Sequence, residues 1–242
     1  ARLRPGVRML VVGGGLIGLE VAAGATRAGL IVTVIEALPR LMSRVLPEAV
    51  AARLVSEHRA AGIDIRTGTT LVTLKRDGEG LDARFDSGDG MRVDLVVVAI
   101  GVLPNVELAA AAGLLVADGI RVDEAFRTND PAISAVGDAA RADLPMFGTS
   151  LRCESQQLAE EQGRYAARRI LGDAAAFAAV PWAWSDQYDK VVQVAGVPAA
   201  GSRTVFRDFD SEGLIACHLA DDGRLVAVTG FGQPQRIAQE VG

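Results

Sequence analysis

Residues 7–36 of the chain read VRMLVVGGGLIGLEVAAGATRAGLIVTVIE, and this stretch decides the fold. Its first part, residues 7–13, is a continuous apolar run, as expected for a strand buried on both faces of a parallel sheet. A glycine-rich turn follows. Residues 16–28 are then good helix formers that Gly29 would cap, and residues 31–36 form a second apolar run. The stretch therefore predicts a strand–helix–strand unit with parallel strands.

The segment after this unit extends it into a Rossmann-type domain. Pro47 suits the first turn of a helix that runs to about Ala61, with Gly62 as its cap, and residues 63–66 predict a third strand. The pattern then changes to strand-like segments separated by DGEG and GDG turns. They predict an antiparallel meander that closes on a buried strand, and its segments are TTLVTLKRD, LDARFDS and MRVDLVVVAI.

The C-terminal half mixes strands and one long helix. ISAVGD at residues 133–138 predicts an apolar strand that ends on an acid, and residues 154–171 predict a helix capped by Gly172. A boundary near residues 174–181 precedes four antiparallel strands, VVQVAG, RTVFRDF, LIACHLA and RLVAVTGF. The expected fold class is α/β, with a Rossmann-type three-layer domain of the FAD/NAD(P)-binding kind and an α+β C-terminal domain.

Composition narrows the class of protein. The net charge of −5 gives no general attraction to nucleic acid or to anionic membranes. The two cysteines, Cys153 and Cys217, form no CxxC pair and have no histidine cluster beside them, so neither a disulfide framework nor a metal site is indicated. The longest apolar runs are far too short to span a bilayer. A cytoplasmic protein that binds neither nucleic acid nor membranes is expected.

Gly13, Gly15 and Gly18 form the GxGxxG fingerprint of a dinucleotide site. The three glycines permit, in order, a tight turn, a close approach of the pyrophosphate to the backbone, and close packing of helix on strand. The helix that begins near Gly15 and Leu16 would offer unpaired N–H groups and a positive dipole end to the phosphates. The fingerprint follows a buried strand and opens a helix, and this context predicts a nicotinamide dinucleotide as ligand.

Glu36 ends the second strand, where a carboxylate would accept hydrogen bonds from both hydroxyls of the adenosine ribose. The same carboxylate would repel a 2′-phosphate, which favours NAD over NADP. Arg40 and Arg44 qualify that preference because a nearby guanidinium could accommodate the extra phosphate. The alternative for both arginines is a solvated surface charge.

Two further acids are candidates for the site. Glu20 lies inside the first helix, just past the glycine turn, and competes with the alternative of an ordinary exposed helix carboxylate. Asp138 ends the ISAVG run, and a carboxylate at the carboxyl end of a buried strand stands where open α/β sheets bind ligands.

At these residues the sequence resembles the ferredoxin reductase family of FAD-containing NADH enzymes, the electron-transfer partners of ring-hydroxylating dioxygenases, of some cytochromes P450 and of rubredoxin. The resemblance covers residues 7 to about 190 and is far more specific than any one motif. The motifs, in the family's order, are GGGLIGLEVAA, VIEALPRLMSRVLP, AIGVLPN, RTNDPAISAVGDAA, RCESQQLAEEQG and PWAWSDQY.

The resemblance implies roles for single residues. Ile17 and Glu20 would lie beside the nicotinamide, Gly101 would line the same pocket, and Asp138 would bind the ribityl chain of FAD. Glu20 would then be a positioning residue, because no side chain has to act as an acid or a base.

The resemblance also implies which residues face the flavin. The helix start near Glu154, Ser155 and Gln156 would point at the pyrimidine end, where the helix dipole stabilises the negative charge that builds on reduction. Trp184 would lie against the isoalloxazine and shield one flavin face. Simple core packing is the alternative for Trp182 and Trp184.

The implied activity is hydride transfer from NADH to FAD, followed by single-electron steps to a small iron–sulfur protein, a ferredoxin or a rubredoxin. Relatives carry an earlier strand, glycine-rich turn and helix that bind the ADP half of FAD, and this chain begins after them, so FAD is expected to bind weakly or not at all. The expected domains are an NAD-binding Rossmann domain at 1–120, a remnant of the FAD-binding domain at 121–175, and a truncated C-terminal reductase domain at 176–242.

Three questions stay open at this point. A flavin disulfide reductase or NADH peroxidase is an alternative from the same wider class, although the chain has no CxxC pair. A nucleotide-binding module without redox activity is an alternative from a different class. Strands left uncovered by the absent part of the FAD domain could also pair two copies into a dimer.

Overall fold

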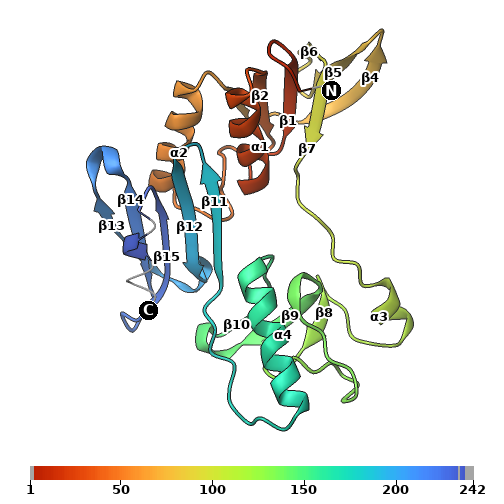
Figure 1. Cartoon of the computed structure of the whole chain (residues 1–242), viewed down its shortest axis with the longest axis vertical. Helices are drawn as coiled ribbons and strands as arrows, with labels where there is room; N and C mark the ends of the chain where they lie inside the picture. The colour runs from red at the N-terminus through yellow and green to blue at the C-terminus, as the bar shows by residue number, and fades with distance from the viewer. Residues whose placement is uncertain (1–2, 234, 238–242) are drawn as a thin grey trace.

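A parallel sheet of four strands forms the centre of the N-terminal half, with the order β3–β2–β1–β7 (Figure 1). The computed structural model describes residues 3–233 and 235–237. Apolar side chains occupy both faces of β1 and β2, because neither face of a covered parallel sheet meets water. The strands are β1 (Arg8–Val12), β2 (Ile31–Glu36), β3 (Asp64–Thr67) and β7 (Leu95–Val98).

Two different layers cover the faces of this sheet, since successive side chains of a strand point to opposite faces. Met9 and Val11 pack with two helices in one core, whereas Leu10 packs with the antiparallel meander in another. The prediction of a three-layer Rossmann-type domain is confirmed. The covering elements are α1 (Leu16–Arg27), α2 (Glu48–Ala60), β4 (Leu71–Asp77), β5 (Gly80–Phe85) and β6 (Gly90–Val93).

The segment MRVDLVVVAI, expected as one strand, is two strands that separate at Asp94. β6 belongs to the meander and β7 to the parallel sheet. Asp94 accepts hydrogen bonds from the backbone N–H of Arg8 (2.9 Å) and from its guanidinium (2.8 and 3.1 Å), which lower the pKa of Asp94 to about 2. A run of apolar residues has the same pattern whether its strand continues or changes partner, so the sequence does not show this break.

A smaller body with its own core follows β7 and occupies the lower part of Figure 1. Phe126, Tyr165 and Phe177 meet edge to face at its centre, with ring centroids 4.9 to 5.7 Å apart. The elements are α3 (Glu107–Ala111), β8 (Ile120–Val122), β9 (Ala140–Leu144), β10 (Thr149–Arg152) and α4 (Gln156–Ile170).

The strand predicted at residues 133–138 is wrong. The segment forms one isolated bridge, between Arg127 and Ser134, and Asp138 lies in the short 3₁₀ turn Gly137–Ala139. An apolar run becomes a strand only where a neighbouring strand can pair its N–H and C=O groups, and within the part of the chain that the structure describes this run has no such ladder. Asp138 therefore does not stand at the end of a buried strand.

The C-terminal part is a five-stranded antiparallel sheet with the order β11–β12–β15–β14–β13. Its four predicted strands are confirmed, and the WAWSDQ segment adds a fifth, β11, that the sequence pattern did not predict. The strands are β11 (Trp182–Gln187), β12 (Lys190–Gly196), β13 (Arg203–Asp208), β14 (Leu214–Leu219) and β15 (Leu225–Phe231).

This sheet packs on the outer side of the two Rossmann helices, as Figure 1 shows. Val192, Leu214 and Phe231 share one apolar core with Leu19 of α1 and Leu54 of α2. The Rossmann-type unit and the C-terminal sheet are thus joined by a continuous buried interface. Among the described residues, no helix is both long and apolar enough to cross a bilayer.

Candidate functional site

Two glycines of the turn are required by the protein itself. Gly13 has a φ of +109°, and a Cβ there would lie 2.3 Å from the carbonyl oxygen of Ala99 after β7. A Cβ on Gly18 would lie 2.1 Å from the carbonyl oxygen of Gly13. Such distances are far below van der Waals contact, so only glycine fits at either place. The tight turn and the close helix packing predicted for these two residues are present.

Gly15 is different. Its φ of −85° is one that any residue adopts, and a Cβ there would meet no protein atom within 4 Å. The protein therefore gives no reason for a glycine at this place. The space in front of Gly15 lies at the N-terminus of α1, where the close approach of a pyrophosphate needs room. The turn therefore leaves open space at the N-terminus of α1.

Glu36 is held beside this turn at the carboxyl end of β2. Its Oε2 accepts a hydrogen bond from the Gly14 N–H (2.8 Å), and its Oε1 accepts one from the Leu38 N–H (2.9 Å). Two backbone donors therefore fix the orientation of the carboxylate. Each oxygen keeps a further lone pair, so the group can still accept a hydrogen bond from each of two ribose hydroxyls.

Arg40 and Arg44 lie in the loop after β2 but differ in their surroundings. The Arg40 guanidinium donates to the carbonyl oxygens of Leu46 (3.0 Å) and Ser43 (3.2 Å), so it supports the loop. Arg44 is exposed and makes no hydrogen bond or ion pair with any residue that the structure describes. Of the two, only Arg44 has its charge available to a ligand.

The segment after β7 borders the same edge of the sheet, because β1, β2 and β7 are parallel and end together. Gly101 lies in this segment with a φ of +106° and open space where a Cβ would be. Ile17, the second residue of α1, is 69% exposed, and Ile100 is 70% exposed. Ile17, which the resemblance places beside the nicotinamide, and Ile100, which the sequence did not single out, thus present exposed apolar side chains near the glycine turn.

Glu20 is tied to the C-terminal sheet. The hydroxyl of Ser185 on β11 donates a hydrogen bond of 2.7 Å to Oε2 of Glu20. Ser185 itself is only 2% exposed. The sequence did not single out Ser185 as a site residue, although it stands inside the WAWSDQY motif, because nothing in the linear pattern shows which helix β11 will face.

The start of α4 gathers the residues predicted for the flavin. Ser155 is the N-cap of this helix; its Oγ accepts from the Leu158 N–H at 3.5 Å and donates to the carbonyl oxygen of Trp182. Its hydroxyl is thus used for capping and for binding β11. Glu154 is exposed and paired with Arg152. Asp138 is in the 3₁₀ turn that packs against α4, where the neighbouring Gly137 N–H donates to Gln162 (2.7 Å).

The two tryptophans of β11 have opposite environments, although they stand two residues apart with Ala183 between them. Trp182 packs against a core of Ile215, Val228 and other buried residues on one face of the C-terminal sheet. Trp184 is 51% exposed. Core packing therefore explains Trp182 but not Trp184, whose ring is available to a planar ligand.

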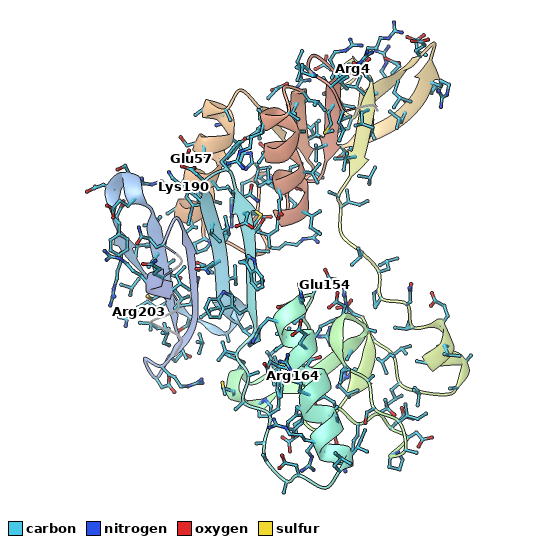
Figure 2. The ribbon with its side chains drawn as sticks, in the orientation of Figure 1. Arg4, Glu57, Glu154, Arg164, Lys190 and Arg203 are labelled. Carbon is cyan, nitrogen blue, oxygen red and sulfur yellow. The ribbon has the colours of Figure 1, made fainter. Side chains whose placement is uncertain are left out.

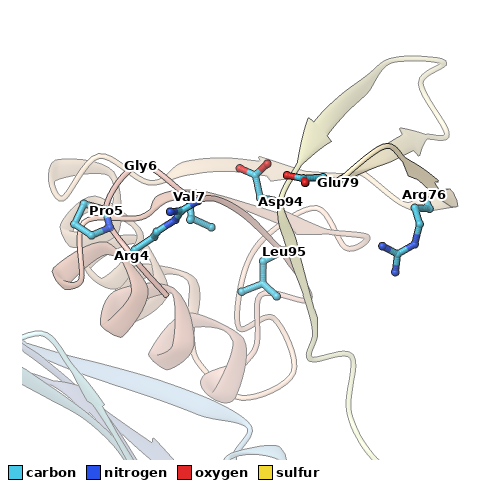
Figure 3. Close-up of a pocket in the computed structure, with 8 residues that line it drawn as sticks. All are labelled: Arg4, Pro5, Gly6, Val7, Arg76, Glu79, Asp94 and Leu95. Atoms are coloured by element: carbon cyan, nitrogen blue, oxygen red, sulfur yellow. The ribbon is translucent and has the colours of Figure 1, made fainter. Parts of the chain in front are cut away.

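A cavity lies away from this site. It has a volume of about 560 Å³ and is lined by charged residues that include Arg4, Arg76 and Glu79 (Figure 3). Val7 and Leu95, which also line it, adjoin the amino ends of β1 and β7. Open α/β sheets bind ligands at the opposite, carboxyl edge, so this cavity is separate from the glycine turn.

Basic side chains of the second body and the C-terminal sheet are mostly paired. Arg164 makes ion pairs with Glu160 (3.0 Å) and Glu161 (2.9 Å) on its own helix. Lys190 pairs with Glu57, and Figure 2 shows the two side by side where β12 meets α2. Within the described ranges no group of His, Cys, Asp and Glu side chains could hold a metal ion.

Comparison with known proteins identifies relatives over almost the whole chain. The family model of pyridine nucleotide-disulphide oxidoreductases matches residues 1–163, and a reductase C-terminal model matches residues 182–240. The ferredoxin–NAD(+) reductase component of an anthranilate 1,2-dioxygenase system from Burkholderia cepacia is 46% identical over 94% of this chain and 56% of its own length. Rhodocoxin reductase from Rhodococcus erythropolis is 40% identical over 94% of this chain and 53% of its own length.

A solved structure agrees with these matches. A chain of the covalent putidaredoxin reductase–putidaredoxin complex superposes on this chain with a TM-score of 0.93 and 36% sequence identity. The superposition covers 99% of this chain and 58% of the chain in that complex. This chain therefore spans a little over half the length of the relatives that it matches. The resemblance predicted from the motifs is confirmed.

Proposed function

Because this chain belongs to the pyridine nucleotide-disulphide oxidoreductase family, we propose that the protein passes electrons from NADH through FAD to a small iron–sulfur protein of the ferredoxin or rubredoxin type. The observation that carries the nucleotide half of this proposal is the space in front of Gly15, bordered by the fixed Glu36 carboxylate. Relatives named as ferredoxin–NAD(+) reductase and rhodocoxin reductase support the acceptor.

The proposed ligand of the glycine turn is NADH in preference to NADPH. A carboxylate held 2.8 Å from the Gly14 N–H cannot turn away from a 2′-phosphate without losing that hydrogen bond. Arg40 is engaged by loop carbonyls, so only Arg44 could offset the repulsion. The proposed contacts with NADH are those of Gly13, Gly15, Leu16, Ile17, Gly18, Glu20, Glu36, Arg44 and Gly101.

The proposed flavin contacts are the start of α4 and the exposed Trp184. The start of α4 offers backbone N–H groups and a positive dipole end. Glu154 directly precedes the N-cap of this helix, and Asp138 lies in the 3₁₀ turn that packs against the helix. When bound, FAD supplies the acceptance of two electrons as hydride and their release one at a time. In this proposal Glu20 orients the nicotinamide and Trp184 covers one face of the flavin ring. The N-terminus of α4 faces the negative charge that develops on the flavin.

We also propose the domain division 1–120, 121–175 and 176–242. The small separate core of the middle part and the strandless segment 173–181 before β11 support a three-part division, whereas α3 and the start of β8 lie with the middle body rather than with the first domain. A cytoplasmic location is proposed as well, since two cysteines provide no disulfide framework.

A disulfide reductase has no support from the cysteines of this chain. Burial raises the pKa of the Cys153 thiol to about 11, so the group is protonated at neutral pH and is a weak nucleophile. Cys217 is buried on β14.

Calorimetric titration of the chain with NADH and with NADPH tests the nucleotide half. Tighter binding of NADH is expected, and failure to bind either nucleotide would contradict the proposal. The electron-transfer half requires the flavin-loaded protein, which is expected to reduce a [2Fe–2S] ferredoxin with NADH faster than it reduces a disulfide such as oxidised glutathione. The reverse preference would favour the disulfide reductase.

A further inference from the structure

A series of polar side chains runs from the exposed Glu20 into the interface between α1, α2 and the C-terminal sheet, and its three middle members are buried. Behind Ser185, the Gln187 side-chain amide donates 2.8 Å to the Ser185 oxygen and 3.5 Å to the Leu16 carbonyl oxygen. The Gln187 Oε1 lies 3.0 Å from Nε2 of His58 on α2, and the Tyr188 hydroxyl lies 3.2 Å from Nδ1 of that histidine. The order is Glu20, Ser185, Gln187, His58, Tyr188.

With a neutral His58 ring, only one arrangement of hydrogens satisfies every member of this series. An ionised Glu20 can only accept, so the Ser185 hydroxyl donates to it and must accept from the Gln187 amide. The Gln187 carbonyl oxygen then faces His58, whose Nε2 must carry the hydrogen. The Nδ1 of His58 is therefore an acceptor, and the Tyr188 hydroxyl donates to it.

Burial makes this arrangement obligatory. Ser185, Gln187 and His58 are 2%, 0% and 0% exposed, and a buried polar group without a partner is costly. Burial also lowers the pKa of His58, which keeps the ring neutral as the arrangement requires. The charges nearby are Glu57, its partner Lys190 from β12, and Arg27 of α1, whose guanidinium lies 5.6 Å from the Tyr188 ring centroid.

The backbone conformation of Tyr188 independently indicates that the fold imposes this hydrogen-bonded series. Tyr188 and Asp189 form the two-residue turn between β11 and β12, and Tyr188 has a φ of +60°. Glycine is the usual residue at such a position, and an aromatic side chain there is strained. Backbone strain persists only where the surroundings impose it. Here they place the phenol hydroxyl on the imidazole.

We propose that Ser185, Gln187, His58 and Tyr188 form a positioning chain through which the C-terminal sheet fixes the Glu20 carboxylate at the nicotinamide end of the dinucleotide site. The inference rests on the proposed function for the identity of the ligand. None of the four residues needs to touch the nucleotide. Their effect is to keep Glu20 in one orientation, so that the nicotinamide meets a preorganised acceptor.

The first test compares NADH with ADP-ribose, which has the same adenosine and pyrophosphate but no nicotinamide. Wild-type chain is expected to bind NADH more tightly than ADP-ribose. Ser185→Ala is expected to weaken NADH binding by about tenfold or more, as for loss of a hydrogen bond to a charged group, with ADP-ribose binding unchanged. Ser185→Thr, which keeps the hydroxyl, should restore the preference.

The second test uses the His58 imidazole as a reporter that needs no nucleotide. The sequence has two histidines, so nitrogen-15 spectra of labelled chain contain two imidazole spin systems. At pH 7 the His58 ring is expected to be neutral with its hydrogen on Nε2. Tyr188→Phe should shift the nitrogen resonances of the His58 ring and weaken NADH binding. Asp189→Asn in the same turn should change neither the resonances nor the affinity.

The outcomes separate this inference from the proposed function. Wild-type chain that binds neither nucleotide would refute the proposed function. Equal affinities for NADH and ADP-ribose, or a Ser185→Ala variant that keeps the preference, would overturn the positioning chain and leave the adenosine site intact. A hydrogen on Nδ1 of His58 would overturn it as well. Loss of the preference in Ser185→Ala and Tyr188→Phe, with Asp189→Asn like wild type, supports it.

Discussion

Replacing the glycines of the turn one at a time separates the residues that the fold needs from the one that the ligand needs. Gly13→Ala puts a Cβ 2.3 Å from the Ala99 carbonyl oxygen, on a backbone with a φ of +109°. The positive φ alone costs about 1–2 kcal/mol, and the clash requires a backbone shift of similar cost, so a loss of about 3 kcal/mol is expected. For a chain of this size that is a fall in melting temperature of about 6–12 °C.

Gly15→Ala and Gly24→Ala are the matched controls. Neither added Cβ meets a protein atom within 4 Å. Gly15→Ala should leave the melting temperature within about 2 °C of wild type yet weaken NADH binding more than about tenfold, because the methyl group occupies the space of the pyrophosphate. Gly24→Ala lies on the exposed side of α1 and should stabilise the helix by about 0.5–1 kcal/mol. Thermal melts and calorimetry measure both effects. A Gly13→Ala protein as stable as wild type, or a Gly15→Ala protein with unchanged affinity, would refute the reasoning.

The site and its surroundings give three further predictions. Glu36→Gln should weaken NADH binding about tenfold and reduce the preference for NADH over NADPH. A neutral amide binds the ribose hydroxyls less strongly than a carboxylate and does not repel a 2′-phosphate. Calorimetry that gives an unchanged ratio of the two affinities would count against the role of Glu36. Burial lowers the pKa of both His58 and His218, so the unfolded chain takes up protons below about pH 6.5 while the folded chain does not. The stability that these two histidines contribute is therefore expected to be complete above about pH 6.5 and to fall as the pH drops towards about 5. Melting temperatures that rise as the pH drops would contradict the lowered pKa of the two histidines. Trp184→Ala should change the melting temperature little, since that ring is 51% exposed. Trp182→Ala should lower the free energy of unfolding by about 2–3 kcal/mol, because that ring packs in a core. Equal effects of the two substitutions in thermal melts would remove the distinction between a core ring and a ring kept for a ligand.

The Rossmann unit could be predicted from local pattern because each of its signals is local. The apolar run of β1, the glycine turn and the helix formers of α1 are consecutive in the chain, and each specifies its own conformation. Glu36 follows from the same pattern, since the second strand of such a unit must end beside the turn.

Two of the errors have a common physical cause, which is that strand pairing joins residues that are distant in the sequence. ISAVGD has the composition of a strand but lacks a partner for a ladder among the residues that the structure describes. MRVDLVVVAI has partners in two sheets and divides between them at Asp94. The third error is local: residues 182–187 pair with β12 across the two-residue turn Tyr188–Asp189, and that turn lacks the glycine that usually marks such a hairpin in a sequence.

What the sequence by itself determined was the fold class, the family and the glycine-and-glutamate dinucleotide motif, because glycine turns, apolar periodicity and motif order are properties of neighbouring residues. Only the tertiary structure decided what each side chain meets. It showed that Glu20 is bound by Ser185, 165 residues away, and that Ser155 is used as a helix cap. It also separated a core Trp182 from an exposed Trp184. Such contacts depend on how the C-terminal sheet packs on α1 and α2, and this packing is a property of the whole apolar interface rather than of any one segment.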